Sequence, residues 1–240
     1  MSEMKIKIIA TGSSKWERFI RRWGVSFLIG EDVLFDTFGD PGVLLNNLRK
    51  FNIDTAKIKH IVLSHDDWDH ISGLWYLIQD RKDITVYICP GFNQEIKDRI
   101  TSFGAGVVEV EPFTMIKEDV FSSGQIQSFC EGRGIFEQVL VVKFLKNLTI
   151  ITGCAHPGVV NIIDAVKRHF SRERVYFILG GFHLKDNTDA MNLNIIKNLQ
   201  ELGVRRIAPT HCTGKRATEM MRGIYGYDFV RVREGDSIEL

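Results

Sequence analysis

The chain has 240 residues, of which 44% are apolar and 25% are charged, a balance typical of a globular protein with a sizeable core. Its formal net charge of +1 argues against a strongly basic nucleic-acid surface, and no apolar run approaches the roughly 20 residues of a membrane span. The segment from Met1 to Ile9 is too short and too charged for a signal peptide, so we expect a cytoplasmic protein without a nucleic-acid or membrane partner.

The cysteines and the absence of repeats limit the domain organisation. None of the four cysteines stands in a CxxC pair, which argues against a zinc knuckle, a redox pair and a disulfide framework. The sequence has neither a fixed-period repeat nor a low-complexity linker. We therefore expect residues 1–240 to form a single domain, with an oligomeric state that the sequence leaves open.

The first half of the chain alternates predicted strands with predicted helices. Apolar, β-branched runs indicate the strands, Gly30-Glu31-Asp32 is typical of a hairpin turn, and Pro41 stands at a favoured helix start. We expect strands at 5–10, 25–29, 33–35, 58–63 and 84–88, and helices at 41–51 and 92–100.

A strand-rich stretch follows, and then helices return. Strands are expected at 107–110, 125–129, 138–144, 148–151, 175–179 and 204–208. An amphipathic helix is indicated by apolar residues at positions i, i+3, i+4, i+7 and i+11: Val159, Ile162, Ile163, Val166 and Phe170. A second helix at 189–202 ends before Gly203. This order predicts a mixed α/β fold in which two sheets lie between outer helices.

A dense group of metal-ligand side chains follows the strand at 58–63. Residues 64–70 read Ser-His-Asp-Asp-Trp-Asp-His, and an apolar helix start comes after them. Imidazole nitrogens and carboxylate oxygens are the ligands that divalent metals use in hydrolysis. In an extended loop alternate residues face one way, so His65, Asp67 and Asp69 are expected to face one cavity, with His70 turning in.

Three further histidines stand at the ends of predicted strands, as His65 does. They are His156, His183 and His211. Strand ends converge at one edge of a layered sheet, so these positions predict a shared metal site. The ligands exceed what one tetrahedral metal needs, which favours two metals sharing a bridging water; a single metal with supporting partners is the alternative.

These residues resemble the metal motifs of the metallo-β-lactamase superfamily. Residues 65–70 match its His-x-His-x-Asp-His motif at three of four ligand positions, and Asp36-Thr37 is similar to its earlier strand-end Asp-Thr. The motifs at 152–158, 180–184 and 209–214 resemble a branch that includes the archaeal dihydropterin–ribofuranosylaminobenzene phosphate synthase-like proteins. The resemblance covers about residues 4–232 and implies a four-layer αβ/βα sandwich.

The resemblance also implies roles for individual residues. One metal would be held by His65, Asp67 and His156, and a second by Asp69, His70 and His211. Asp36 would support the metal loop. Cys154 stands where many members place a bridging aspartate, so either a metal contact or a buried apolar cysteine is expected there. Asp69 and His183 would be catalytic. His183 would be a general acid, a substrate contact or a metal ligand, and a role without direct metal ligation is favoured.

Asp67 departs from the superfamily motif, which has a histidine at this position. A carboxylate makes the ligand set harder, so iron or manganese becomes more favourable relative to zinc. We expect one or two divalent ions and a metal-dependent hydrolase or phosphate-ester transferase acting on a small anionic or phosphorylated molecule. The alternatives are an iron-dependent oxidoreductase, because flavodiiron members also carry a carboxylate here, and a catalytically weak ligand- or metal-binding scaffold.

Signals for the substrate are few. Cations and aromatic rings alternate at Trp16, Arg18, Arg21, Arg22 and Trp23, where they would cover the site and hold a planar anion or form an ordinary surface loop. Lys215 and Arg216 begin a predicted helix close to His211, where they would meet a phosphate or lie on the surface. The substrate itself is not identified.

Overall fold

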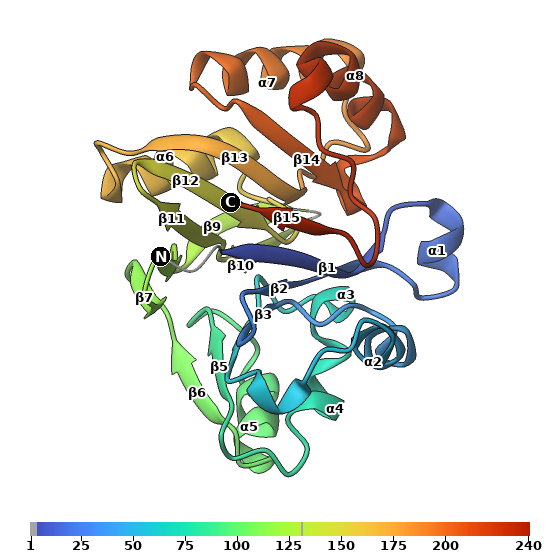
Figure 1. The fold of residues 1–240 in the computed structure, drawn as a ribbon, viewed down its shortest axis with the longest axis vertical. Helices are drawn as coiled ribbons and strands as arrows, with labels where there is room; N and C mark the ends of the chain where they lie inside the picture. Colours follow the sequence, from blue (N-terminus) through green and yellow to red (C-terminus); the bar gives the residue numbers. More distant parts are fainter. Residues whose placement is uncertain (1–3, 131) are drawn as a thin grey trace.

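Two β-sheets pack against each other between helices in this computed structural model, which describes residues 4–130 and 132–240 (Figure 1). The first sheet has the strand order β15-β1-β2-β3-β4-β5-β6. Its strands are β1 (Lys5–Gly12), β2 (Gly24–Ile29), β3 (Val33–Phe35), β4 (His60–Val62), β5 (Thr85–Ile88), β6 (Gly106–Glu109) and β15 (Ser237–Glu239). The strands β3 to β6 are parallel to one another, whereas β15 pairs with β1 in the antiparallel direction.

The second sheet has the strand order β14-β13-β12-β11-β8-β7. Its strands are β7 (Thr114–Lys117), β8 (Val120–Ser122), β11 (Leu140–Phe144), β12 (Asn147–Thr152), β13 (Arg174–Gly181) and β14 (Arg206–Thr210). The strands β12, β13 and β14 are parallel, so their carboxyl ends meet at one edge. A separate hairpin joins β9 (Ile126–Cys130) to β10 (Arg133–Glu137).

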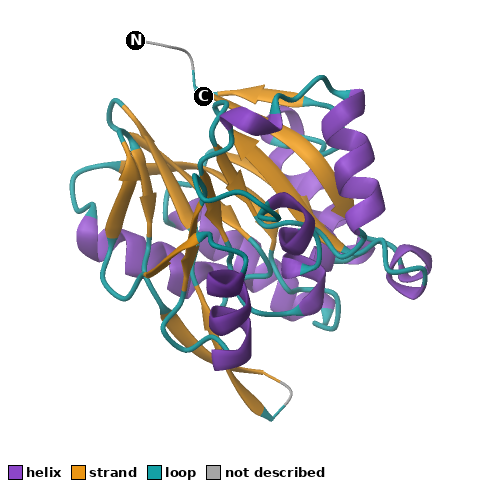
Figure 2. Cartoon of the chain, turned by 90° about the horizontal axis from the view of Figure 1, so that it is seen from below, coloured by secondary structure: helices purple, strands orange, loops and turns teal. Residues whose placement is uncertain are grey.

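Helices lie outside both sheets (Figures 1 and 2). On the side of the first sheet are α2 (Pro41–Lys50), α3 (Trp68–Ile71), α4 (Leu74–Leu77) and α5 (Gln94–Ser102). On the side of the second sheet are α6 (Val159–His169), α7 (Asp189–Glu201) and α8 (Lys215–Tyr225). The short α1 (Lys15–Phe19) projects from the body and has no buried residue. Three single 3-10 turns cover Thr55–Lys57, His211–Thr213 and Gly226–Asp228.

Three apolar clusters hold these four layers together. Phe27 and Phe35 of the first sheet meet Phe177 of the second in the inter-sheet core. The outer faces of the two sheets pack against their helices, as Leu44 of α2 and Ile196 of α7 illustrate. Each fully buried side chain of this size stabilises the fold by about 1.5 to 3 kcal/mol. The arrangement confirms the predicted four-layer sandwich of the metallo-β-lactamase type.

Most predicted elements are present with ends that differ by a few residues. Four short strands and one helix lie outside the predicted elements: β7, β8, β10, β15 and α1. These segments are only three to five residues long, so their own composition carries little strand or helix signal. Pairing with neighbours, such as that of β15 with β1, supplies what the local sequence lacks. None of the helices within the described ranges combines the length and the apolarity of a membrane span.

Candidate metal centre

The loops after five strands carry polar side chains to one edge of the sandwich. In the first sheet Asp36 follows β3, and His65 comes shortly after β4. In the second sheet β12, β13 and β14 lead to His156, His183 and His211. Ring centroids lie 4.7 Å apart between His65 and His156, and 4.5 Å apart between His156 and His183. The structure therefore brings together histidines that stand up to 146 positions apart, from 65 to 211.

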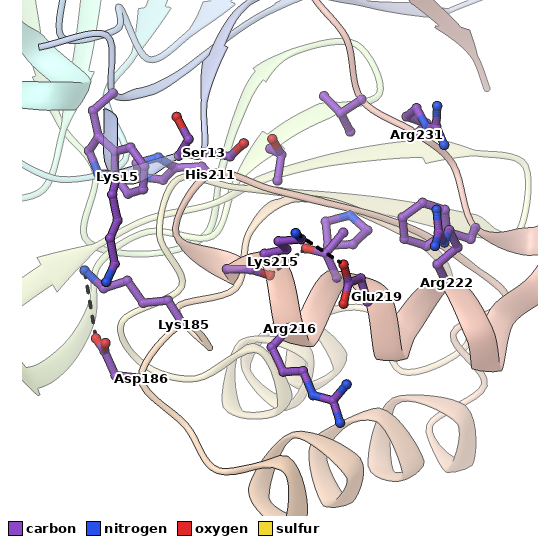
Figure 3. Close-up of a pocket in the computed structure, with 18 residues that line it drawn as sticks. Ser13, Lys15, Lys185, Asp186, His211, Lys215, Arg216, Glu219, Arg222 and Arg231 are labelled. Carbon is purple, nitrogen blue, oxygen red and sulfur yellow. Dashed lines mark hydrogen bonds and ion pairs between the residues drawn. The ribbon is translucent and has the colours of Figure 1, made fainter. Parts of the chain in front are cut away.

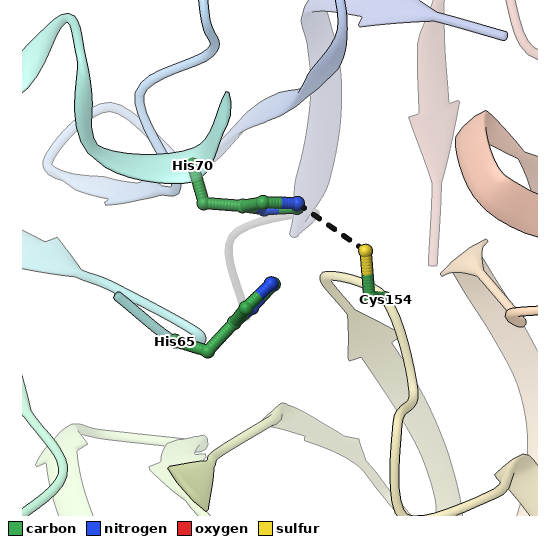
Figure 4. A group of neighbouring side chains, drawn as sticks. All are labelled: His65, His70 and Cys154. Carbon is green, nitrogen blue, oxygen red and sulfur yellow. Dashed lines mark hydrogen bonds between the residues drawn. The ribbon is translucent and has the colours of Figure 1, made fainter. Parts of the chain in front are cut away.

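His70 points into this edge from α3, toward the same space as Cys154 (Figure 4). Its Nε2 atom lies 3.3 Å from Oδ2 of Asp69 and 3.4 Å from Sγ of Cys154. Its Nδ1 atom lies 2.6 Å from Oδ2 of Asp36, whose other oxygen accepts a hydrogen bond from the Ser64 backbone N–H. Because Asp36 accepts the Nδ1 proton, the lone pair on Nε2 faces Asp69 and Cys154.

His211 faces the same two residues from the opposite side. Its Nε2 atom lies 3.2 Å from Sγ of Cys154 and 3.4 Å from Oδ2 of Asp69. Its Nδ1 atom lies 3.0 Å from the Gly12 carbonyl oxygen and 3.2 Å from the Gly24 backbone nitrogen. When Nδ1 donates its proton to Gly12, the lone pair on Nε2 is directed at Cys154 and Asp69. Four possible ligand atoms thus converge from α3, the β12 loop and the end of β14.

A second group forms around His65 and includes a residue that the sequence interpretation missed. His65, His156 and Glu137 place one possible ligand atom each within 4.8 Å of one another. Glu137 ends β10 and is fully buried, and its carboxylate accepts hydrogen bonds from the backbone N–H groups of Cys154, Ala155 and His156. It also lies 2.9 Å from Nδ1 of His156. The sequence gives no clear signal for Glu137, because β10, the strand that it ends, lies outside the predicted strands.

The imidazoles and carboxylates of the cluster shift one another's pKa values. Burial alone would lower the pKa of His70, but the carboxylates of Asp36 and Asp69 raise it well above its usual value. Burial alone would raise the pKa of Glu137, but the hydrogen bond from His156 and the neighbouring imidazoles hold it below its usual range. The Nε2 atom of His65 is buried without a hydrogen-bond partner among the described residues. Buried imidazole nitrogens and carboxylate oxygens that face one another fit the ligands of a divalent cation.

Among the described residues, four of the ten non-glycine residues with positive φ lie at this edge. Asp36, Ala155, His183 and His211 adopt left-handed conformations with φ between 50° and 60°. Such conformations cost non-glycine residues roughly 1 to 3 kcal/mol each and persist where the surroundings hold them. Gly153 allows the two sheets to approach here, because a Cβ atom at this position would lie 2.1 Å from the Ser64 hydroxyl oxygen. The fold is therefore strained where the side chains converge.

Asp67, which was expected to be a metal ligand, forms an ion pair with Arg133 of β10. Its other oxygen lies 3.5 Å from Nε2 of His65. Among the described residues, none of the groups of three possible ligands includes Asp67. The alternation expected of an extended loop ends at Asp67, because α3 begins at Trp68. Asp67 as a ligand stays a prediction.

The Asp67→His variant tests this prediction. We expect it to bind zinc more tightly than the wild type, because an imidazole at position 67 restores the common motif beside His65 and cannot pair with Arg133. Calorimetric titration of metal-free protein with zinc measures the change. Asp66→His is the matched control, since Asp66 faces the backbone of Asn93 instead. Unchanged zinc affinity and stoichiometry in Asp67→His would place Asp67 outside the ligand set.

His183 lies beside a second thiol that was given no role from the sequence. His183, Cys154 and Cys212 form another group with possible ligand atoms within 4.8 Å. Cys212 is buried and lies 3.4 Å from the Cys154 carbonyl oxygen. The hydrogen bond with Cys212 raises the pKa of His183. His183 thus borders the cluster at the end of β13. Its ring lies next to that of His156 and not among the residues that face His70.

Comparison with known proteins gives this arrangement a context. Residues 31–129 match the family model of the Beta-lactamase superfamily domain. The 7,8-dihydropterin-6-methyl-4-(beta-D-ribofuranosyl)-aminobenzene-5'-phosphate synthase of Methanocaldococcus jannaschii is 27% identical over 267 residues, which cover 92% of this chain and 91% of that protein. An uncharacterized protein of the same organism is 29% identical over 258 residues, with 92% and 97% coverage.

Solved structures agree with the family match. A crystal structure of a metal-dependent hydrolase of the beta-lactamase superfamily is 28% identical, covers 99% of both chains and has a TM-score of 0.79. The metallo-beta-lactamase fold protein YhfI from Bacillus subtilis has a TM-score of 0.72 at 13% identity, covering 98% of this chain and 99% of its own, and shares the fold. Residues 31–129 thus match a Beta-lactamase superfamily domain, and with its two sheets and convergent histidines the whole chain is similar to a metal-dependent hydrolase of that superfamily.

Proposed function

We propose that the protein is a metal-dependent hydrolase or phosphate-ester transferase that acts on a small anionic or phosphorylated molecule. The observation that carries this proposal is the convergence of Asp69, His70, Cys154 and His211, with distances of 3.2 to 3.4 Å between their facing atoms. Two imidazole nitrogens, a carboxylate oxygen and a thiol sulfur directed at one buried point are ligand types that a divalent cation binds in proteins. A divalent cation is also the cofactor that hydrolases of this fold use.

Two groups of side chains would hold one or two ions. Asp69, His70 and His211 form the first, with Cys154 as an additional contact. His65 and His156 form the second, in which either Glu137 or Asp67 supplies the carboxylate. When bound, the metal lowers the pKa of a water molecule and stabilises negative charge that develops on the substrate. Zinc, iron and manganese all suit a mixed set of imidazole, carboxylate and thiolate ligands.

The surrounding residues would fix the direction of the ligands. Asp36 holds the His70 ring, and Glu137 holds both the His156 ring and the backbone of the β12 loop. Replacing a residue that orients a metal ligand typically lowers metal affinity or activity by about 10- to 100-fold. In our proposal Asp69 accepts a proton from the attacking water, and His183, at the border of the cluster, contacts the substrate and donates a proton to the leaving group.

A phosphorylated substrate is favoured by the likeness to the archaeal synthase, whose name describes a phosphate-bearing compound. The iron-dependent oxidoreductase is less favoured, because it was inferred from Asp67 as a ligand. Asp67 instead pairs with Arg133 and belongs to no group of three ligands within the described part of the chain. The group of Asp69, His70, Cys154 and His211 does not include Asp67, so the hydrolase proposal does not depend on Asp67.

Removing and restoring the metal tests the proposed function. Chelator-treated protein would be assayed against 4-nitrophenyl phosphate, bis(4-nitrophenyl) phosphate and a thioester, before and after zinc, manganese or anaerobic iron is added. We expect hydrolysis of at least one phosphoester to depend on added metal, because the protein side chains alone offer no comparable electrophile. Metal-loaded protein that hydrolyses none of these substrates would contradict the proposal, and oxygen consumption with iron would favour the oxidoreductase.

A further inference from the structure

A large cavity adjoins the metal centre on the side of α8 (Figure 3). Its volume is about 750 Å³, which lies within the usual range for a pocket that encloses a small molecule. It is walled by three segments far apart in the sequence: residues 13–23 around α1, residues 185–186 after β13, and residues 209–232 from β14 onward. Of the residues proposed to hold the metal, the cavity shares only His211.

The wall of the cavity carries more positive than negative charge. The basic residues that line it are Lys15, Lys185, Lys215, Arg216, Arg222 and Arg231. Two acidic residues, Asp186 and Glu219, line it as well, and they reach Lys185 and Lys215 only at 3.9 and 4.0 Å. The described carboxylates form no ion pair with Lys15, Arg222 or Arg231. The cavity therefore has cations available for an anion.

The remaining part of the wall is apolar and includes an aromatic face. Trp23, Pro209, Phe229 and Val232 contribute it. Trp23 is only 8% exposed and its ring lies 4.6 Å from that of His211. A pocket with both an apolar face and unpaired cations suits a ligand with an apolar, planar body and an anionic group.

The start of α8 adds positive electrostatic potential to the cavity. The helix has 11 residues and begins after Gly214, with no side chain capping its first backbone N–H groups. Such groups favour anions, in addition to the nearby cations of Lys15 and Lys185. Gly214 has a φ of 80°, and a Cβ atom there would lie 2.6 Å from the Cα atom of Lys185. The glycine thus allows Lys185 to lie against the helix start.

His211 connects the cavity to the metal centre. It lines the cavity, while its Nε2 atom faces Cys154 and Asp69 in the metal cluster. A ligand held in the cavity would therefore lie next to the metal ligands. We propose that this cavity binds a phosphate monoester with a planar apolar body, with the phosphate among the cations and the body against the apolar wall that Phe229 and Val232 form with Trp23. That this ligand is the substrate rests on the proposed function; the binding itself does not.

Calorimetric binding of phenyl phosphate tests the cavity. The probe would be titrated into metal-loaded and into chelator-treated protein, with inorganic phosphate and phenol as partial probes. We expect phenyl phosphate to bind at least about tenfold more tightly than either partial probe in both forms, since only it engages both parts of the wall. Phosphate binding as tightly as phenyl phosphate would overturn the apolar part of the proposal, and loss of all binding after chelation would assign the anion to the metal instead.

Two charge reversals provide the variants, because both side chains are exposed and neither supports the core. Lys215→Glu and Arg222→Glu should each weaken phenyl phosphate binding about tenfold or more. Lys197→Glu on the exposed face of α7 is the matched control and should bind as the wild type does. Wild-type affinity in both cavity variants would overturn the proposal even if the protein is a hydrolase. Binding that persists in a protein without hydrolase activity would contradict the proposed function alone.

Discussion

Replacing His70 with alanine is expected to remove most of the bound metal and to lower kcat/KM by well over 100-fold. Its Nε2 atom faces both Asp69 and Cys154, and its ring is fully buried. The expected loss exceeds the roughly 10- to 100-fold that is typical for residues which only orient a ligand. Metal content by mass spectrometry and steady-state kinetics on the best phosphoester measure the two effects.

Two further variants make the His70 result interpretable. His70→Gln fills more of the buried space and keeps a hydrogen-bond donor for Asp36, so it separates loss of the ligand from loss of packing. His169→Ala is the matched control, because His169 stacks on Phe113 at a centroid distance of 4.1 Å and belongs to no ligand group among the described residues. Full metal content and wild-type turnover in His70→Ala would remove His70 from the site.

Replacing Glu137 with alanine is expected to destabilise the protein by about 3 to 5 kcal/mol. The carboxylate is buried and accepts the N–H groups of Cys154, Ala155 and His156, besides contacting the His156 ring. A buried donor left without its acceptor costs about 1 to 3 kcal/mol, and breaking a buried charged pair costs about 3 to 5 kcal/mol. Urea denaturation of metal-free protein measures the free energy of unfolding.

The Glu137 prediction has an internal comparison and a surface control. Glu137→Gln keeps one carbonyl acceptor, so it should lose less stability than Glu137→Ala. Glu118→Ala changes an exposed glutamate in the turn between β7 and β8 and should be close to neutral. If Glu137→Ala unfolds at the same urea concentration as Glu118→Ala, the carboxylate does not hold the β12 loop, and its role at the site would be limited to the His156 ring.

The positions of the histidines could be predicted because they depend on a simple property of sheets. His65, His156 and His211 each follow an apolar run, and the carboxyl ends of parallel strands meet at one edge. Apolar periodicity gave the strands and helices that build the sandwich, such as α6 with its buried Ile162 and Val166. The fold class follows from these patterns without knowledge of any contact.

Glu137 and the side-chain direction of Asp67 could not be predicted in this way. Glu137 ends β10, a five-residue strand that pairs with β9 alone among the described strands and whose sequence gives little strand signal. Its role depends on the β12 loop, which is 17 to 19 residues further along the chain. The direction of Asp67 depends on where α3 begins and on Arg133, which is 66 residues away. Long-range partners of this kind leave no local pattern.

The cavity beside α8 was foreseen only in part. Lys215 and Arg216 were expected near His211, and both line the cavity. The three arginines and two tryptophans of residues 16–23 were expected either to cover the site or to form a surface loop, and only Trp23 of this set lines the cavity. Arg18 and Arg21 instead lie over the rings of Trp23 and Trp68. A cavity formed by three distant segments requires their relative positions, which composition does not contain.

Anomalous scattering from crystals of protein purified without chelator is the most direct test of the proposed metal site. We expect at least one metal ion bonded to His70, His211 and Asp69, and metal analysis of the same preparation should give at least one ion per chain. The same preparation of His70→Ala should lack this peak. If these three side chains bind no ion in crystals grown from metal-loaded protein, the proposed metal site would be contradicted.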